Sequence, residues 1–89
     1  MNNQRRKTLA RIMDNLRDLR DQLSEIYDEL EGVRDEEDET KENMPENLQC
    51  SERYDTMETN IDTMDDALSD IDAIRDDIDS VLETLEDVE

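Results

Sequence analysis

Apolar residues follow a seven-residue rhythm through the first half of the chain. They are spaced alternately three and four residues apart over nearly four repeats, the heptad pattern of a helix that packs lengthwise against another helix. The pattern predicts a long helix over about residues 4–41. Its a and d positions carry Leu9, Ile12, Leu16, Leu19, Leu23, Ile26, Leu30 and Val33.

The second half of the chain keeps the same alternation and predicts a helix over about residues 51–87. One position breaks the pattern, because residue 75 is an arginine and an isoleucine precedes it. We expect Arg75 to reach outward while Ile74 fills the layer; the alternative is a buried polar residue that fixes the register. The apolar positions are Tyr54, Met57, Ile61, Met64, Leu68, Ile71, Ile78, Leu82 and Leu85.

The two patterns match each other if the chain folds back on itself. When paired residue numbers sum to 94, every a position meets a d position, from Leu9 with Leu85 to Val33 with Ile61. The sequence therefore predicts an all-α fold, an antiparallel two-helix coiled-coil hairpin that forms one domain over residues 1–89. Dimerisation of two hairpins into a four-helix bundle stays open.

The connector is expected over about residues 42–50. Asn43 and Glu46 have the spacing of a capping box, and Pro45 is tolerated in a first helical turn. Ser51 is a second candidate cap, for the second long helix. The single cysteine, Cys50, lies in this connector and allows no intramolecular disulfide, as is usual in a reducing cytosol.

Composition excludes most catalytic sites. The chain has 29 acidic and 10 basic residues, a net charge of −19, no histidine and one glycine. Histidine-based triads, common zinc sites and glycine-rich phosphate loops are therefore ruled out, and we expect no enzyme activity, cofactor or metal. No apolar run approaches the roughly 20 residues that span a bilayer, so we expect a cytoplasmic protein that binds no membrane.

Charge is distributed unevenly along the chain. Residues 1–20 hold six basic and two acidic groups, whereas residues 21–89 hold four basic and 27 acidic groups. An antiparallel hairpin places the basic start beside the acidic end, which favours this arrangement. Four cations at e positions of the first helix are expected to reach carboxylates of the second: Arg6, Arg20, Arg34 and Lys41.

The density of carboxylates suggests a function. A hairpin of such helices is roughly 55 Å long, and B-DNA of that length carries about 32 charges, between the −19 of one chain and the −38 of two. This favours a non-catalytic inhibitor that binds the basic groove of a nucleic-acid-handling protein and itself binds no nucleic acid. The candidate contacts are Asp35, Glu36, Glu37, Asp38, Glu39, Asp62, Asp65, Asp66, Asp70, Asp72, Asp76 and Asp77.

A resemblance adds to this hypothesis. The connector reads Asn43-Met44-Pro45-Glu46-Asn47-Leu48-Gln49, and Ser51-Glu52-Arg53-Tyr54 and Met57-Glu58 follow it. This stretch resembles a segment of small acidic helical proteins from Gram-positive bacteria and their phages or prophages. The resemblance implies a mobile-element setting, in which an anti-restriction or anti-CRISPR inhibitor is the concrete form, located in the host cytoplasm. It carries over no functional residues.

The alternative function is a structural coiled-coil module for oligomerisation or adaptor binding, with no link to nucleic acid. Such a module uses apolar contacts outside the seam, and a homodimer is one form of it. Helix two carries most of the additional apolar positions. The residues expected to make these contacts are Met13, Tyr27, Ala67, Ala73, Ile74 and Val81.

Overall fold

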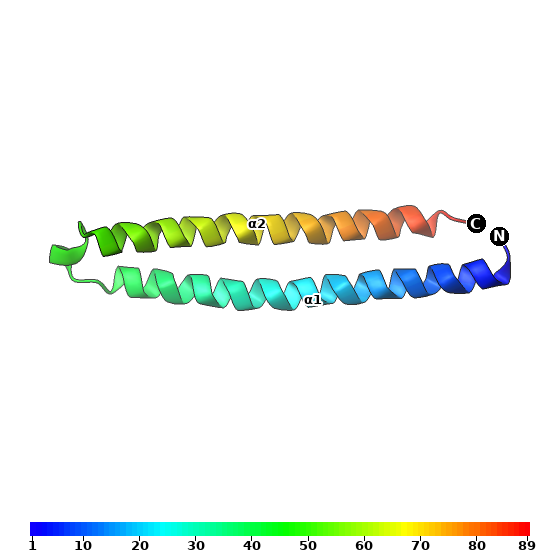
Figure 1. Cartoon of the computed structure of the whole chain (residues 1–89), viewed down its shortest axis with the longest axis horizontal. Coiled ribbons are helices and arrows are strands. Elements are labelled where there is room, and N and C mark those ends of the chain that lie inside the picture. The colour runs from blue at the N-terminus through cyan, green and yellow to red at the C-terminus, as the bar shows by residue number, and fades with distance from the viewer.

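The computed structural model describes residues 1–89 as a two-helix hairpin. Helix α1 spans Asn3–Glu42, a short 3-10 helix η1 spans Glu46–Leu48, and helix α2 spans Glu52–Glu86. The long helices lie side by side and run in opposite directions, so both termini lie at the same end of the molecule (Figure 1). The predicted all-α antiparallel hairpin is confirmed.

Of the two helix caps expected at the connector, one is present in the structure. Ser51 is the N-cap of α2, and its Oγ accepts a hydrogen bond from the Tyr54 backbone N–H at 3.2 Å. The capping box expected at Asn43 is wrong, because Asn43 ends α1 instead. Its backbone N–H donates to the Glu39 carbonyl at 3.0 Å, so the residue completes the last turn of a helix and starts none.

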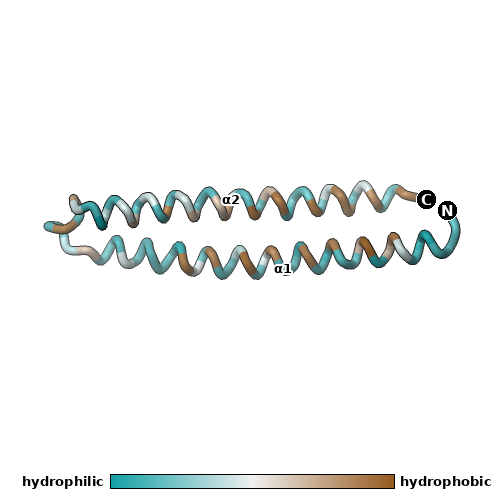
Figure 2. Tube along the Cα trace, viewed as in Figure 1, coloured by the Kyte–Doolittle hydropathy of each residue, from teal (hydrophilic) through white to brown (hydrophobic).

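The hairpin is a thin rod with extents of 70 × 16 × 13 Å. Two helices cannot enclose a core on all sides, so most apolar side chains keep part of their surface in water. Apolar turns recur along both helices, whereas the last turns of α1 before the connector are hydrophilic (Figure 2). The five buried residues all belong to α2: Met57, Ile61, Leu68, Ile78 and Leu82.

The two helices use their heptads differently. On α2, the buried residues occupy the expected a and d positions. On α1, position a faces α2, but position d does not, and the seam is completed by position e, as at Met13 and Tyr27, which are half-buried. The prediction that both a and d of the first helix face the second is therefore wrong for d. The exposed d residues are Ile12, Leu19, Ile26 and Val33.

The expectation for Arg75 is also wrong. The Arg75 side chain lies against α1 and is only 25% exposed, whereas Ile74 points outward and is 47% exposed. Two groups on α1 hold the guanidinium there: Ser24 Oγ accepts a hydrogen bond at 3.1 Å, and the Tyr27 ring lies beneath it at 4.7 Å. A cation over an aromatic face is attracted by the ring, which favours this inward position.

Three ion pairs join the helices along one side of the seam. Arg20 contacts Asp79 at 2.7 Å, Arg34 contacts Asp65 at 2.8 Å, and Lys41 contacts Glu58 at 3.9 Å. The spacing between pairs is 14 and then seven residues on both helices, so the register stays constant along the rod. Three of the four expected e-position cations thus reach α2, while Arg6 makes no ion pair. We call this side the ion-pair face.

Candidate binding surfaces of the hairpin

Arg34 is the centre of the ion-pair face. Its Nε donates to Asp65 of α2 at 2.8 Å, and its Nη1 contacts two carboxylates of its own helix, Asp35 at 3.3 Å and Asp38 at 3.5 Å. The hydrogen bond that Arg34 donates to Asp65, followed by the one that it donates to Asp35, raises the pKa of Arg34 above its usual range. This guanidinium therefore holds three carboxylates in one cluster.

Arg20 repeats the arrangement two heptads closer to the termini. Its Nη1 donates to Asp79 Oδ1 at 2.7 Å, and its Nε lies 3.8 Å from Asp21. The hydrogen bond to Asp79 raises the pKa of Arg20, and the opposing effect of desolvation is smaller. At the connector end, Lys41 lies over the Tyr54 ring at 5.4 Å. These contacts join α1 to α2 along the ion-pair face, beside the apolar seam.

The twelve carboxylates predicted to bind a partner are on the surface but are not gathered in one place. Glu37, Asp38 and Asp65 are half-buried, and the other nine are exposed. They are distributed over both helices and over more than one side of the rod. No group of three or more acidic or cysteine side chains is arranged to hold a metal ion.

Four of these twelve carboxylates already contact a cation of the hairpin. Arg34 contacts Asp35, Asp38 and Asp65, and Arg75 contacts Asp72. The other eight make no ion pair and are available to external cations. They are Glu36, Glu37, Glu39, Asp62, Asp66, Asp70, Asp76 and Asp77.

The opposite side of the rod carries a second surface, which we call the apolar face. On α1 it consists of the row of d residues, which are 43 to 54% exposed: Ile12, Leu19, Ile26 and Val33. On α2 it consists of Ile74 and Val81, both 47% exposed, and Val88, 46% exposed, continues the seven-residue spacing just beyond the end of the helix. The half-buried Ala67 extends the second row toward the connector.

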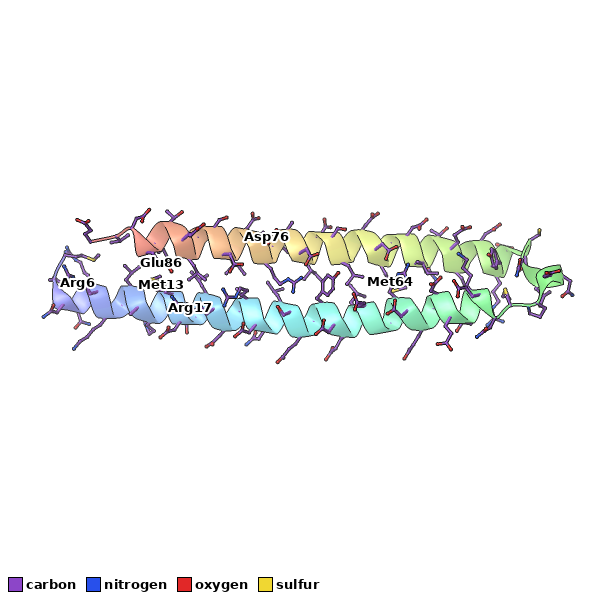
Figure 3. All side chains as sticks on the ribbon, turned by 180° about the vertical axis from the view of Figure 1, so that it is seen from behind. Arg6, Met13, Arg17, Met64, Asp76 and Glu86 are labelled. Atoms are coloured by element: carbon purple, nitrogen blue, oxygen red, sulfur yellow. The ribbon has the colours of Figure 1, made fainter.

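Two shallow hollows place both rows on the same side. Ile12 and Val88 border one hollow at the termini, and Val33 and Asn60 border another toward the connector. Asn60 precedes Ala67 by seven residues and so belongs to the α2 row. Met64, which also lines the second hollow, lies between the helices, as does Met13 (Figure 3).

The apolar face is also poor in charge. The rows that flank it contain the uncharged residues Thr8, Asn15, Gln22, Thr63 and Thr84. The exceptions are Glu29, Glu36, Asp70 and Asp77. In a chain of which 44% is charged, the two apolar rows themselves hold no charged residue, and four of the nine positions that flank them are acidic.

The expectation that Met13 and Tyr27 lie outside the seam, free for apolar contacts with another chain, is wrong. Met13 and Tyr27 lie in the seam between the helices, and the d residues of α1 are exposed in their place. Ile74 and Val81 are exposed, as the alternative function requires. The signal for the apolar face was the seven-residue row of Ala67, Ile74, Val81 and Val88 beside the seam of α2.

Neither helix contains an apolar stretch of the length and hydrophobicity that would let it cross a membrane. No protein-family model, curated protein or solved structure matches the chain. The ion-pair face with its neighbouring carboxylates and the apolar face are therefore the features of this chain that bear on its function.

Proposed function

We propose that this protein is a non-catalytic inhibitor that occupies the basic groove of a nucleic-acid-handling protein in place of nucleic acid. The observation that carries the proposal is the acidic surface of a straight rod. Eight candidate carboxylates have no cation partner within the hairpin. Arginine and lysine side chains of a target can therefore pair with them while the ion pairs of the hairpin stay intact.

The charge per length supports the comparison with a duplex. The rod is 70 Å long and has a net charge of −19. A B-DNA duplex of that length carries about 41 phosphate charges, at one per 1.7 Å. One chain therefore has about half the charge density of DNA, and a basic groove that attracts phosphates also attracts this surface.

The connector's resemblance to small acidic proteins of Gram-positive bacteria and phages gives the proposal a concrete form. In that setting the inhibitor acts in the host cytoplasm against a restriction or CRISPR enzyme. Its carboxylates compete with phosphates for the same arginine and lysine residues, so binding and inhibition are expected to weaken as salt rises.

The test is affinity purification with the tagged chain from a Gram-positive bacterial lysate, with mass spectrometry of the recovered proteins at low and high salt. We expect a nucleic-acid-binding protein that is recovered at low salt and lost at high salt. The test variant replaces four exposed, unpaired carboxylates with lysine: Asp62, Asp66, Asp76 and Asp77. This variant should lose the partner and keep its helical circular dichroism spectrum.

A matched control changes the net charge equally at other exposed, unpaired positions. It replaces Asp18, Glu25, Asp28 and Glu31 of α1 with lysine. We expect this control to retain more binding than the test variant, because its substitutions lie outside the predicted contacts. Equal binding by the test variant and the unmodified chain contradicts the proposal.

The apolar face favours a second candidate function, a structural module that assembles through apolar contacts. Such a module has salt-resistant partners, because burial of apolar surface is not screened by ions. Recovery of a partner with no link to nucleic acid, at both low and high salt, favours this candidate over the inhibitor.

A further inference from the structure

The packing of α1 is incomplete in the single hairpin. In a two-stranded coiled coil, positions a and d both face the one partner helix. Here position a faces α2 and position d faces solvent, and Leu19 and Ile26 at the middle of the d row are 46% and 50% exposed. A helix with apolar residues in both directions is typical of a bundle, in which each helix has two neighbours.

We propose that the apolar face binds a second copy of this chain, and that the two hairpins form a four-helix bundle with their connectors at opposite ends. The apolar rows cover about 32 Å of the rod, the length that 21 residues span at 1.5 Å each, and the whole side of the rod that carries them is 70 Å long and 16 Å wide. This side is sufficient for the roughly 800 Å² per partner that a standard stable interface buries. The inference does not rest on the proposed function, because self-association needs no nucleic-acid-handling partner.

The spacing of the α1 row suits a two-fold axis. In the opposite-end arrangement, α1 lies on α1 of the second copy and runs the other way, so the same surface serves both copies. The row from Ile12 to Val33 is centred between residues 22 and 23. Ile12 therefore meets Val33 of the second copy, and Leu19 meets Ile26 of the second copy.

The α2 row has its centre at nearly the same height along the rod. Ile74 and Val81, the exposed apolar residues of this row within α2, are centred between residues 77 and 78, so Ile74 meets Val81 of the second copy. The Arg20–Asp79 ion pair joins the two helices close to both centres. A single two-fold axis thus brings both rows into contact at once.

Charge favours connectors at opposite ends over connectors at the same end. Residues 35–66 hold 13 acidic and two basic groups, and a same-end dimer would place two such segments together. The opposite-end dimer instead places the start of α1 against residues 35–39 of the second copy. That start carries three cations without an ion pair in the hairpin, Arg5, Arg6 and Lys7, so the two segments are complementary.

Self-association leaves the outer acidic positions exposed. Asp62, Asp66 and Asp76 belong to heptad rows away from the apolar face and stay on the surface of the bundle. Two copies carry −38 over a rod of about the same 70 Å, close to the roughly 41 charges of a duplex of that length.

Sedimentation equilibrium tests whether two copies of the chain associate. We expect the unmodified chain to reach twice its 10.5 kDa mass as its concentration rises to about 0.1 mM. The test variant carries Leu19→Gln and Ile26→Gln, and its dissociation constant should rise at least tenfold. Its helicity should persist, because both side chains lie outside the seam. The control is Leu48→Gln, a leucine 45% exposed in the connector, which should leave the dimer unchanged.

Two outcomes would overturn the proposal that a second copy binds the apolar face. One is a chain that stays at 10.5 kDa throughout this concentration range, which leaves the apolar face to a different partner. The other is a Leu19→Gln/Ile26→Gln variant that dimerises as well as the unmodified chain, which places any dimer contact elsewhere.

The exposed Cys50 provides a test of the arrangement. A spin label on this single connector cysteine reports the distance between the two connectors. Connectors at opposite ends predict a label-to-label distance close to the 70 Å length of the rod. A distance below half that length, or rapid formation of a Cys50 disulfide within the dimer, overturns the opposite-end arrangement.

Salt dependence separates this inference from the proposed function. Two copies repel each other through their net charges of −19, so added salt should tighten the dimer. Added salt should weaken binding to a basic groove. Dimerisation that weakens with salt contradicts an interface based on the apolar face, whatever the result of the partner search.

Discussion

Arg75 and Tyr27 lie in the seam between the helices, where Ile74 and the d residue Ile26 were expected. The heptad allows either Ile74 or Arg75 to face α1, and the choice is made by Ser24 and Tyr27, about 50 residues away along the chain. The long apolar stem of arginine tolerates such a place when its head finds partners. The sequence around position 75 does not contain this information, so the inward arginine could not be predicted from it.

The ion pairs of the same seam were predictable, because they follow from position alone. Arg20, Arg34 and Lys41 occupy successive or alternate e positions, and the acidic second helix offers a carboxylate opposite each. Arg6 occupies an equivalent position and borders the same hollow as Glu86, yet the two make no ion pair. The heptad position thus predicts the ion pair correctly for the three cations from Arg20 to the connector, but not for Arg6 near the termini.

Arg34→Gln should destabilise the hairpin, because it removes the cation that holds three carboxylates together. We expect the midpoint of thermal unfolding, followed by circular dichroism, to fall by a few degrees. The control is Arg53→Gln, which removes the same charge from an exposed arginine that makes no ion pair. Equal losses in the two variants would show that net charge, and not the cluster around Arg34, determines the effect.

Helix α1 differs from its prediction by a rotation about its own axis. The a residues face α2 as expected, but e residues such as Arg20 and Tyr27 take the seam positions that the d residues were expected to fill. A strict a and d repeat occurs both in helix pairs and in bundles. The repeat therefore predicted the helix and its length, but not whether the d or the e residues join the a residues in contact with α2.

Gly32 lies inside α1, where glycine lowers helix stability and the structure offers no compensating contact. A Cβ added at this position meets nothing within 4 Å. Gly32→Ala should therefore stabilise the helix by about 1 kcal/mol, which raises the thermal midpoint by about 4–8 °C in a domain of this size. Gly32→Ser should fall between the two, because serine has an intermediate helix propensity. A lower thermal midpoint for Gly32→Ala than for the unmodified chain would show that the added Cβ is not accommodated without a clash.

The whole molecule balances a few attractions against many repulsions. Eight of its 29 acidic residues contact a cation: Asp14, Asp21, Asp35, Asp38, Glu58, Asp65, Asp72 and Asp79. The other 21 face water or other carboxylates. Repulsion among them opposes the close approach of α1 and α2, and the thin seam has only five buried residues to resist it.

Mild acidification should therefore stabilise the hairpin. The raised pKa of Arg20 and of Arg34 means that the stability these cations contribute is present at all pH values below their usual range and is lost only in strong alkali. Between pH 7 and about 4.5, only carboxylates begin to gain protons, and those without a cation partner outnumber the paired ones. Relief of repulsion should exceed the loss of ion pairs, so the thermal midpoint should rise, and added salt at pH 7 should raise it as well. A midpoint that falls on acidification would mean that the Arg20 and Arg34 clusters outweigh the repulsion of the remaining surface.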